Sequence, residues 1–117
     1  MSGAHSPTAT PMREWKWSPA EKAAARRAFD LALSRKLEDT VREATERAAR
    51  ITETSDLWKL ETWLGEQRRR IDRTFDYRYS VLPTVFAALL RDGKVTEEDL
   101  SGLALDKLDA IRHLARP

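Results

Sequence analysis

The densest group of side chains with functional potential is a run of four arginines between residues 68 and 73. Guanidinium groups bind phosphates, and the aromatic residues near this run can stack on bases, so nucleic-acid binding has to be considered. A helix, however, spreads the four side chains over more than one face, with Arg69 and Arg73 sharing one of them. Three carboxylates between residues 66 and 76 are close enough in sequence to neutralise much of the charge. We therefore interpret the run as an ion-paired or solvated helix face and predict no nucleic-acid partner.

A second group imitates part of a calcium-binding loop. The run Asp92–Val95, followed by Asp99, matches the second half of such a helix–loop–helix unit. The positions that should supply the first acidic ligands are Ala88 and Leu90, which cannot bind a cation. The chain has no cysteine and only two histidines, which leaves no basis for a thiolate or multi-histidine metal site. We predict a helix–turn–helix corner here and no metal.

Catalytic groupings are not suggested by the sequence. No serine, histidine and carboxylate combination with the spacing of a nucleophilic site occurs, and His113 falls near the end of a predicted helix, where the helix dipole favours it. The carboxylates occupy ordinary helix-surface and capping positions. We predict a protein that is not an enzyme and carries no cofactor.

The composition describes one small domain with balanced charge. The 117 residues contain 21 Lys and Arg against 19 Asp and Glu, and the two signs are nearly balanced in each half of the chain as well. Neither half therefore has the one-signed excess of a polyanion binder. No apolar run approaches the ~20 residues of a membrane span. The absence of cysteine and of a signal peptide predicts a cytoplasmic protein. We expect a flexible tail over residues 1–17, because it is small, polar and proline-containing, and one domain over residues 18–117.

A long first helix is predicted over residues 18–51. Ser18 supplies a capping hydroxyl, Pro19 fits the first helical position, and Glu21 completes a capping box. Apolar residues then recur every three or four positions up to Ile51, which is the period of a straight helix. Such a helix reaches ~50 Å, whereas a compact chain of this size has a radius of gyration of ~13 Å. The helix must therefore break or pack on a second copy, and we favour the second copy.

The remaining chain is predicted to form further helices and no strands. A second helix is expected over about residues 56–75, and a head of short helices over about residues 80–116, including a short helix after the capping sequence that begins at Thr96. Trp58 and Trp63 lie on or near one apolar stripe of the second helix. Either both indoles are core residues, or one anchors an interface, since tryptophan is enriched at binding hot spots.

Three separate motifs in the second half of the chain resemble one known family. They are the run Asp56–Leu60 (DLWKL), the spaced run Ser80–Leu90 (SV, VFA, LL), and the ending Leu114–Arg116 (LAR). In this order and spacing the chain resembles the fluorescence recovery protein family, closely over about residues 50–116 and loosely over the first helix. The resemblance implies an all-α fold with a long N-terminal helix and a small helical head, arranged as an antiparallel homodimer.

The resemblance also implies a function. Cyanobacterial members bind the photoactivated orange carotenoid protein, chiefly through its C-terminal domain, speed its return from red to orange, and help it leave the phycobilisome. The family pattern implies that Trp58 and Arg68 lie near the dimer interface and the functional surface. We extend this expected interface to three neighbours, which are Glu61, Trp63 and Leu64. On the head, the expected partner surface consists of Phe86, Leu114 and Arg116.

The sequence departs from the family pattern at several positions. Cyanobacterial members have an acid where Thr62 stands, an aromatic residue where Thr84 stands, and a basic residue where Ala110 stands, and Pro83 enters a helix that they leave without proline. Two interpretations stay open: a regulator of the orange carotenoid protein, or a related dimeric helical module that serves another partner, such as a related carotenoid or stress protein.

Overall fold

The computed structural model describes residues 11–117, and all regular structure in this range is helical. No strand occurs between residues 11 and 117, so the predicted all-α fold is confirmed. The elements are a 3-10 turn η3 (Met12–Glu14) and four α-helices, α1 (Pro19–Ala49), α2 (Thr54–Thr74), α3 (Leu82–Arg91) and α4 (Leu105–Ala115).

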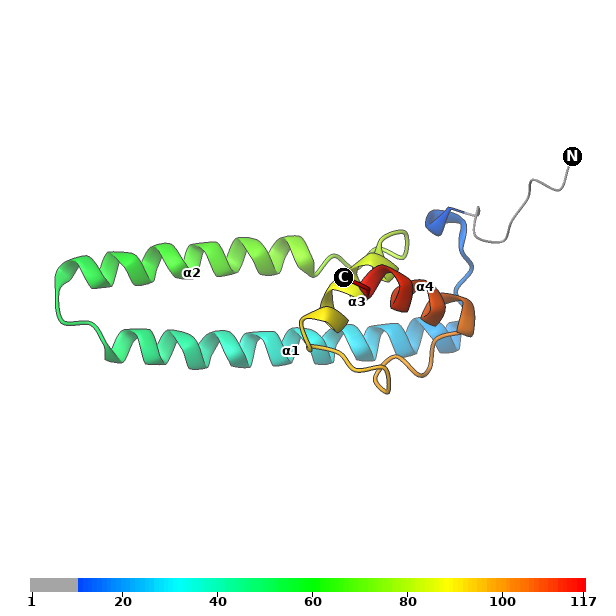
Figure 1. The fold of residues 1–117 in the computed structure, drawn as a ribbon, viewed down its shortest axis with the longest axis horizontal. Helices are drawn as coiled ribbons and strands as arrows, with labels where there is room; N and C mark the ends of the chain where they lie inside the picture. The colour runs from blue at the N-terminus through cyan, green and yellow to red at the C-terminus, as the bar shows by residue number, and fades with distance from the viewer. Residues whose placement is uncertain (1–10) are drawn as a thin grey trace, which may run out of the picture.

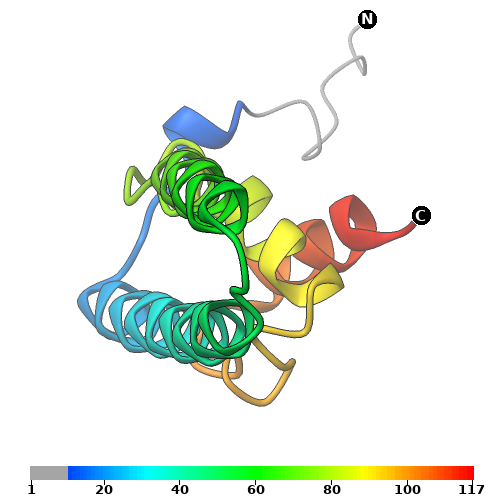
Figure 2. The same cartoon turned by 90° about the vertical axis from the view of Figure 1, so that its left-hand side faces the viewer.

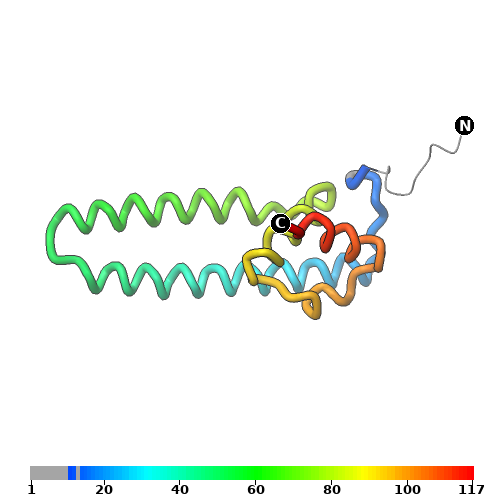
Figure 3. Tube along the Cα trace, viewed as in Figure 1, coloured from blue at the N-terminus to red at the C-terminus, as the bar shows by residue number. Residues whose placement is uncertain are grey.

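The molecule consists of a long helical arm and a small head. Helices α1 and α2 run antiparallel and project well beyond α3 and α4, which gather at one end of the hairpin (Figure 1). In the Cα trace, the far half of the arm extends away from the head (Figure 3). The radius of gyration is 18.3 Å, against ~13 Å for a compact domain of about this length. The first helix therefore runs unbroken and extends outside the core.

The start of α1 is fixed by its own sequence. The Ser18 hydroxyl accepts a hydrogen bond from the Glu21 amide at 3.1 Å, and the Glu21 carboxylate accepts one from the Ser18 amide at 3.1 Å. Pro19 occupies the first turn, where its missing N–H has no cost. These contacts confirm the predicted capping box. The helix ends at Ala49, shortly before the predicted end.

The core lies in the head and uses only the first half of α1. The buried face of α1 carries Phe29 and a series of small residues, which let the helices of the head approach closely. From α3, Leu82, Phe86 and Leu89 are almost completely buried, and α4 contributes Ile111. The second half of α1 has no buried residue. Viewed along the arm, the head lies to one side of the two parallel helix axes (Figure 2).

The folded part begins before the first capping residue. Trp17, which the sequence analysis assigned to the end of a tail, is 9% exposed and packs against Tyr79, with a ring-centroid distance of 5.3 Å. A single large aromatic residue supplies enough apolar area to attach this segment to the head. Residues 1–10 of the expected tail lie outside the described range.

The predicted short helix after Thr96 does not form. Thr96 and Asp99 exchange the hydrogen bonds of a capping start, but residues 97–102 form successive turns. Leu100 and Leu103 are buried, and Gly102 passes so close to α1 that a Cβ there would lie 2.5 Å from that of Ala24. The packing of this loop on α1 therefore overrides the local capping signal.

Candidate interaction surface

The arm carries most of the large apolar side chains that remain exposed between residues 11 and 117. Six of the eight lie on α1 and α2, and two lie on α4. Contiguous exposed apolar area is typical of a binding surface, because its exposure to water is unfavourable. The six on the arm are Leu31, Leu37, Val41, Leu57, Trp58 and Leu64.

One face of α2 combines apolar and charged residues of the expected site. Leu57, Glu61, Leu64 and Arg68 follow one another at spacings of four, three and four, which places them on one side of a helix. All four are exposed, Leu57 by 46% and Leu64 by 42%. We call this set the α2 stripe. Neither Glu61 nor Arg68 has an ion-pair partner within residues 11–117.

The two indoles of α2 have different surroundings. Trp58 is 57% exposed and lies beside the α2 stripe. Trp63 is half-buried and lies against α1, with the Arg47 guanidinium 4.5 Å from the ring centroid. The same Arg47 is held by an ion pair to Glu43 at 2.7 Å. Trp63 thus helps to hold the two helices of the arm together, while Trp58 is free to contact a partner.

The arginine run is less neutralised than its sequence suggests. In the described part of the chain, Arg68, Arg69, Arg70 and Arg73 make no ion pair. Asp76 lies beyond the end of α2 and binds Arg78 at 2.5 Å; this hydrogen bond lowers the pKa of Asp76. The end of α2 therefore presents a band of unpaired positive charge.

Of the three head residues expected on a partner surface, Phe86 is not on the surface. Phe86 has no exposed area, because α3 directs it into the core against α1 and α4, so it has no surface to offer a partner. Leu114 is 37% exposed and Arg116 is exposed, and both stand near the end of α4. The guanidinium of Arg91 donates to the Leu114 carbonyl at 3.2 Å, which fixes this end of α4 against α3. Sequence periodicity alone could not distinguish these positions, since α3 is apolar on nearly every side.

Two of the four positions that depart from the expected family pattern are exposed. Thr62 on α2 and Thr84 on α3 are exposed, and Ala110 on α4 is half-buried. Pro83 is fully buried in the first turn of α3, where it leaves the helix unbroken. None of the four departures interrupts a helix.

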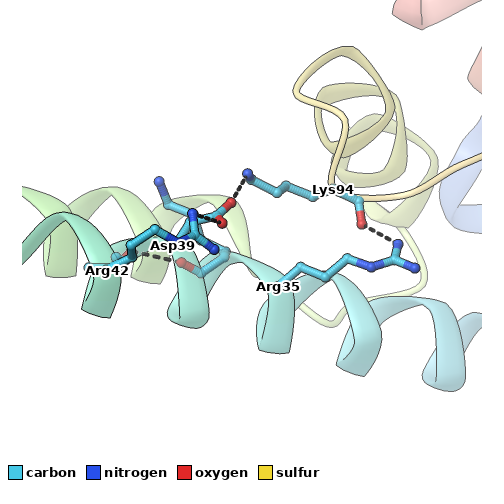
Figure 4. A network of polar contacts seen from close by, with 6 residues as sticks. Arg35, Asp39, Arg42 and Lys94 are labelled. Atoms are coloured by element: carbon cyan, nitrogen blue, oxygen red, sulfur yellow. Dashed lines mark hydrogen bonds and ion pairs between the residues drawn. The ribbon is translucent and has the colours of Figure 1, made fainter.

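A network of charged groups joins the base of the arm to the head. The Arg35 guanidinium donates to the Lys94 carbonyl at 2.9 Å and to the Asp99 carboxylate at 2.7 Å. The Lys94 ammonium in turn binds Asp39 on α1, and Arg42 binds the same carboxylate at 3.0 Å (Figure 4). The hydrogen bonds from these cations lower the pKa of Asp39 and of Asp99. The angle between arm and head is therefore fixed by α1 and the loop after α3.

A buried ion pair attaches α4 to the start of α1. The Lys107 ammonium, which is 3% exposed, lies 2.9 Å from Glu21 and 5.0 Å from the centroid of the Trp17 ring. Burial opposes ionisation of Glu21, but hydrogen bonds from the Ala104 and Ser18 amides and from Lys107 lower its pKa to about 2. Glu21 therefore both caps α1 and holds the start of α4, and local sequence indicates only the capping role.

Two further features were sought within residues 11–117. No group of three histidine, cysteine or carboxylate side chains in this range could hold a metal ion. None of the helices in it is both long and apolar enough to cross a membrane.

Comparison with known proteins identifies one family. Residues 17–115 match the family model described as the photoprotection regulator fluorescence recovery protein. The fluorescence recovery protein of Synechocystis sp. is 42% identical over 103 residues, which covers 88% of this chain and 94% of the relative.

Solved structures of the same family have the same fold. The fluorescence recovery proteins of Fremyella diplosiphon and of Synechocystis sp. superimpose on this chain with a TM-score of 0.83 in each case, at 37% and 41% identity. Each match covers 87% of this chain and all of the solved chain. The match therefore includes the arm as well as the head.

Proposed function

Because the chain belongs to the fluorescence recovery protein family of photoprotection regulators, we propose that it acts by binding the orange carotenoid protein. In this proposal it contacts the C-terminal domain of the photoactivated red form, accelerates reversion to orange, and promotes release from the phycobilisome. A protein that speeds such a change must bind the structure between the two states more tightly than the red state. This task requires a shaped surface and no catalytic side chains, which agrees with the absence of any recognisable catalytic grouping in the sequence.

We propose further that the working unit is an antiparallel homodimer formed through the arm. The observation that supports it is the half-apolar α2 stripe, whose four residues stay exposed although another side of α2 packs on α1. A two-fold axis between Leu64 and Gly65 brings Glu61 of one copy opposite Arg68 of the other.

The mass in solution tests the dimer. Light scattering at micromolar concentration should give about 27 kDa, twice the 13.4 kDa of the chain. A value near that of one chain at concentrations up to 100 micromolar would contradict the dimer and leave the exposed α2 stripe unexplained.

The proposed activity is tested by dark recovery. A photoconverted orange carotenoid protein is mixed with this protein in substoichiometric, equal and excess amounts, and the return of the orange absorption spectrum is followed. Acceleration that rises with added protein, together with a complex on size exclusion, is the expected result. No acceleration at tenfold excess and no complex would refute the proposal for the carotenoid protein used.

One observation favours a second candidate function. Thr62 and Thr84 are exposed at positions where the family pattern has an acid and an aromatic residue. A partner that relies on those side chains would bind this chain less well, so the same fold could serve another protein. The variants Thr62→Asp and Thr84→Phe, alone and combined, separate the two cases. If the carotenoid protein is the partner, the unaltered chain already accelerates recovery, whereas under the second function only the altered chains do so.

A further inference from the structure

A cavity of about 350 Å³ lies where the arm meets the head. Its lining comes from α1, from the last turn of α2 and the residue after it, from α3, and from the loop after α3. Figure 3 shows these segments converging at the point where the hairpin leaves the head. The volume is at the lower end of the ~300–1,000 Å³ typical of ligand sites. The lining residues are Lys36, Arg70, Ile71, Thr74, Phe75, Leu89, Asp92 and Lys94.

The lining combines an apolar floor with a positively charged rim. Leu89 is buried, and Ile71 and Phe75 are half-buried. Among the charged lining residues, three are cations and only Asp92 is an acid. The site is therefore suited to a group that has both a negative charge and an apolar body.

Two of the three cations are available to a ligand. The Lys94 ammonium already binds Asp39. Lys36 and Arg70, in contrast, have no ion-pair partner in the part of the chain that the structure describes. They come from different helices and line the same cavity. A carboxylate bound by both would make two charge-assisted hydrogen bonds.

Unpaired positive charge continues along α2 beyond the cavity. Arg73 follows Arg70 by three residues, so the two side chains are neighbours on the helix surface, ~5–6 Å apart at Cβ. In an extended peptide, side chains two residues apart point the same way at a separation of ~6.6 Å. Two carboxylates at alternate positions of an extended peptide therefore have about the same separation as Arg70 and Arg73. A third side chain on the same side of the peptide reaches the cavity.

Nucleic acid fits this surface less well than a peptide. Glu66, Asp72 and Asp92 are interspersed with the basic residues, and a regularly spaced chain of phosphates would meet them. A phosphate backbone would also make no favourable contact with the apolar floor.

We propose that the cavity between arm and head binds an acidic peptide segment of a protein partner. A carboxylate of the segment lies between Lys36 and Arg70, and a bulky apolar side chain covers Ile71, Phe75 and Leu89. The proposal specifies the chemistry of the bound segment and holds whichever protein supplies it. It is therefore independent of the outcome of the dark-recovery experiment.

The test uses a short peptide as the probe and the full chain labelled with ¹⁵N. The peptide is acetyl-Glu-Ser-Glu-Ser-Phe-amide, titrated at low salt while backbone amide signals are followed. The expected result is saturable shifts concentrated at Lys36, Thr74 and Lys94. Two comparison peptides, one with glutamine for both glutamates and one with alanine for phenylalanine, should each bind at least fivefold more weakly.

A matched pair of variants tests the assignment to the cavity. Arg70→Glu should weaken peptide binding at least tenfold, whereas Arg69→Glu, one residue away and outside the lining, should change it less than threefold. Equal effects of the two variants, shifts located elsewhere, or equal binding of the glutamine peptide would overturn the proposal. So would an eight-residue oligothymidylate that binds more tightly than the peptide and shifts the same amides, since it would assign the surface to nucleic acid. Sedimentation of both variants shows whether either substitution alters assembly.

Discussion

Apolar residues of the head have different roles according to whether they face the core or the solvent. Phe86 and Leu114 were both expected on a partner surface, yet Phe86 is completely buried and Leu114 is 37% exposed. The same apolar character thus stabilises the fold at one position and remains available for binding at the other.

This difference gives a prediction for two truncations. Phe86→Ala should lower the free energy of unfolding by about 3–5 kcal/mol, because it leaves a cavity in the core. Leu114→Ala should lower it by less than about 1 kcal/mol. Urea denaturation at pH 7 measures both. A small loss for Phe86→Ala would contradict the buried position, and any loss of partner binding in that variant has to be read against its fraction folded.

The ionisation of Glu21 contributes to the stability of the folded chain. Its pKa is about 2 in the folded chain, against an ordinary value of 4.5. Because the folded pKa is the lower one, the stabilisation is complete above about pH 4.5 and is lost as the pH falls toward 2. The difference corresponds to about 3 kcal/mol.

The variant Glu21→Gln tests this assignment. It should be about 2–3 kcal/mol less stable than the natural chain at pH 7, because the buried Lys107 then loses the carboxylate at 2.9 Å and keeps only Asp106 at 3.9 Å. The gap between the two proteins should narrow between pH 4.5 and pH 2.5. Glu43→Gln, which breaks an exposed pair with Arg47, is the matched control and should cost less than about 0.5 kcal/mol. A gap that stays constant down to pH 2.5 would exclude a lowered pKa.

At the scale of elements, the head is assembled on one half of α1. The alanine-rich face of that half lets other segments approach α1 closely, and the loop after α3 does so at Gly102. The network around Arg35 and Lys94 then fixes the other end of the same loop. Beyond Asp39, no hydrogen bond or ion pair joins α1 to the head within residues 11–117, and the pairing of this part of α1 with α2 includes the contact of Trp63 with Arg47.

The close approach at Gly102 predicts a steric effect. Gly102→Ala should destabilise the chain by about 1–3 kcal/mol, since the new methyl group would lie 2.5 Å from the Ala24 Cβ. The double variant Gly102→Ala, Ala24→Gly removes the overlap and should recover part of the loss, offset by the ~1 kcal/mol cost of glycine in a helix. Thermal and urea unfolding of the three proteins measure this. Equal stability of the natural chain and Gly102→Ala would show that the loop shifts at no cost.

At the scale of the whole molecule, an extended shape leaves the arm without enough partners of its own. The largest dimension is 68 Å, while the other two are 28 and 22 Å. An arm of this kind exposes Leu57, Trp58 and Leu64 unless something covers them. The proposed dimer covers them with the same surface of a second copy.

A charge exchange tests the symmetry of that dimer. Glu61→Arg and Arg68→Glu should each weaken dimerisation about 10- to 100-fold, because each places like charges opposite one another twice per dimer. The double variant restores opposite charges and should recover most of the affinity. Analytical ultracentrifugation across a concentration series measures the three constants. If the double variant loses as much dimerisation free energy as the two single variants together, Glu61 and Arg68 do not face each other. The dimer would then have a different two-fold axis.

The sequence by itself determined the helices and, through separated motifs, the family. Capping residues, apolar periodicity and prolines act within a few residues of one another, so α1, α2 and α4 could be located to within a few positions. The length of the first helix also showed that the chain could not be compact. The same local signals failed after Thr96, where a cap is followed by turns.

Tertiary structure alone decided which residues face the core and which face a partner. An apolar α3 gives no indication that Phe86 is buried, and a capping glutamate gives none that it binds Lys107 some 86 residues away. The attachment of Trp17 to the head and the unpaired cations around the cavity also arise only when distant segments meet. The physical reason is that burial and charge pairing depend on separation in space, whereas capping and periodicity depend on separation along the chain.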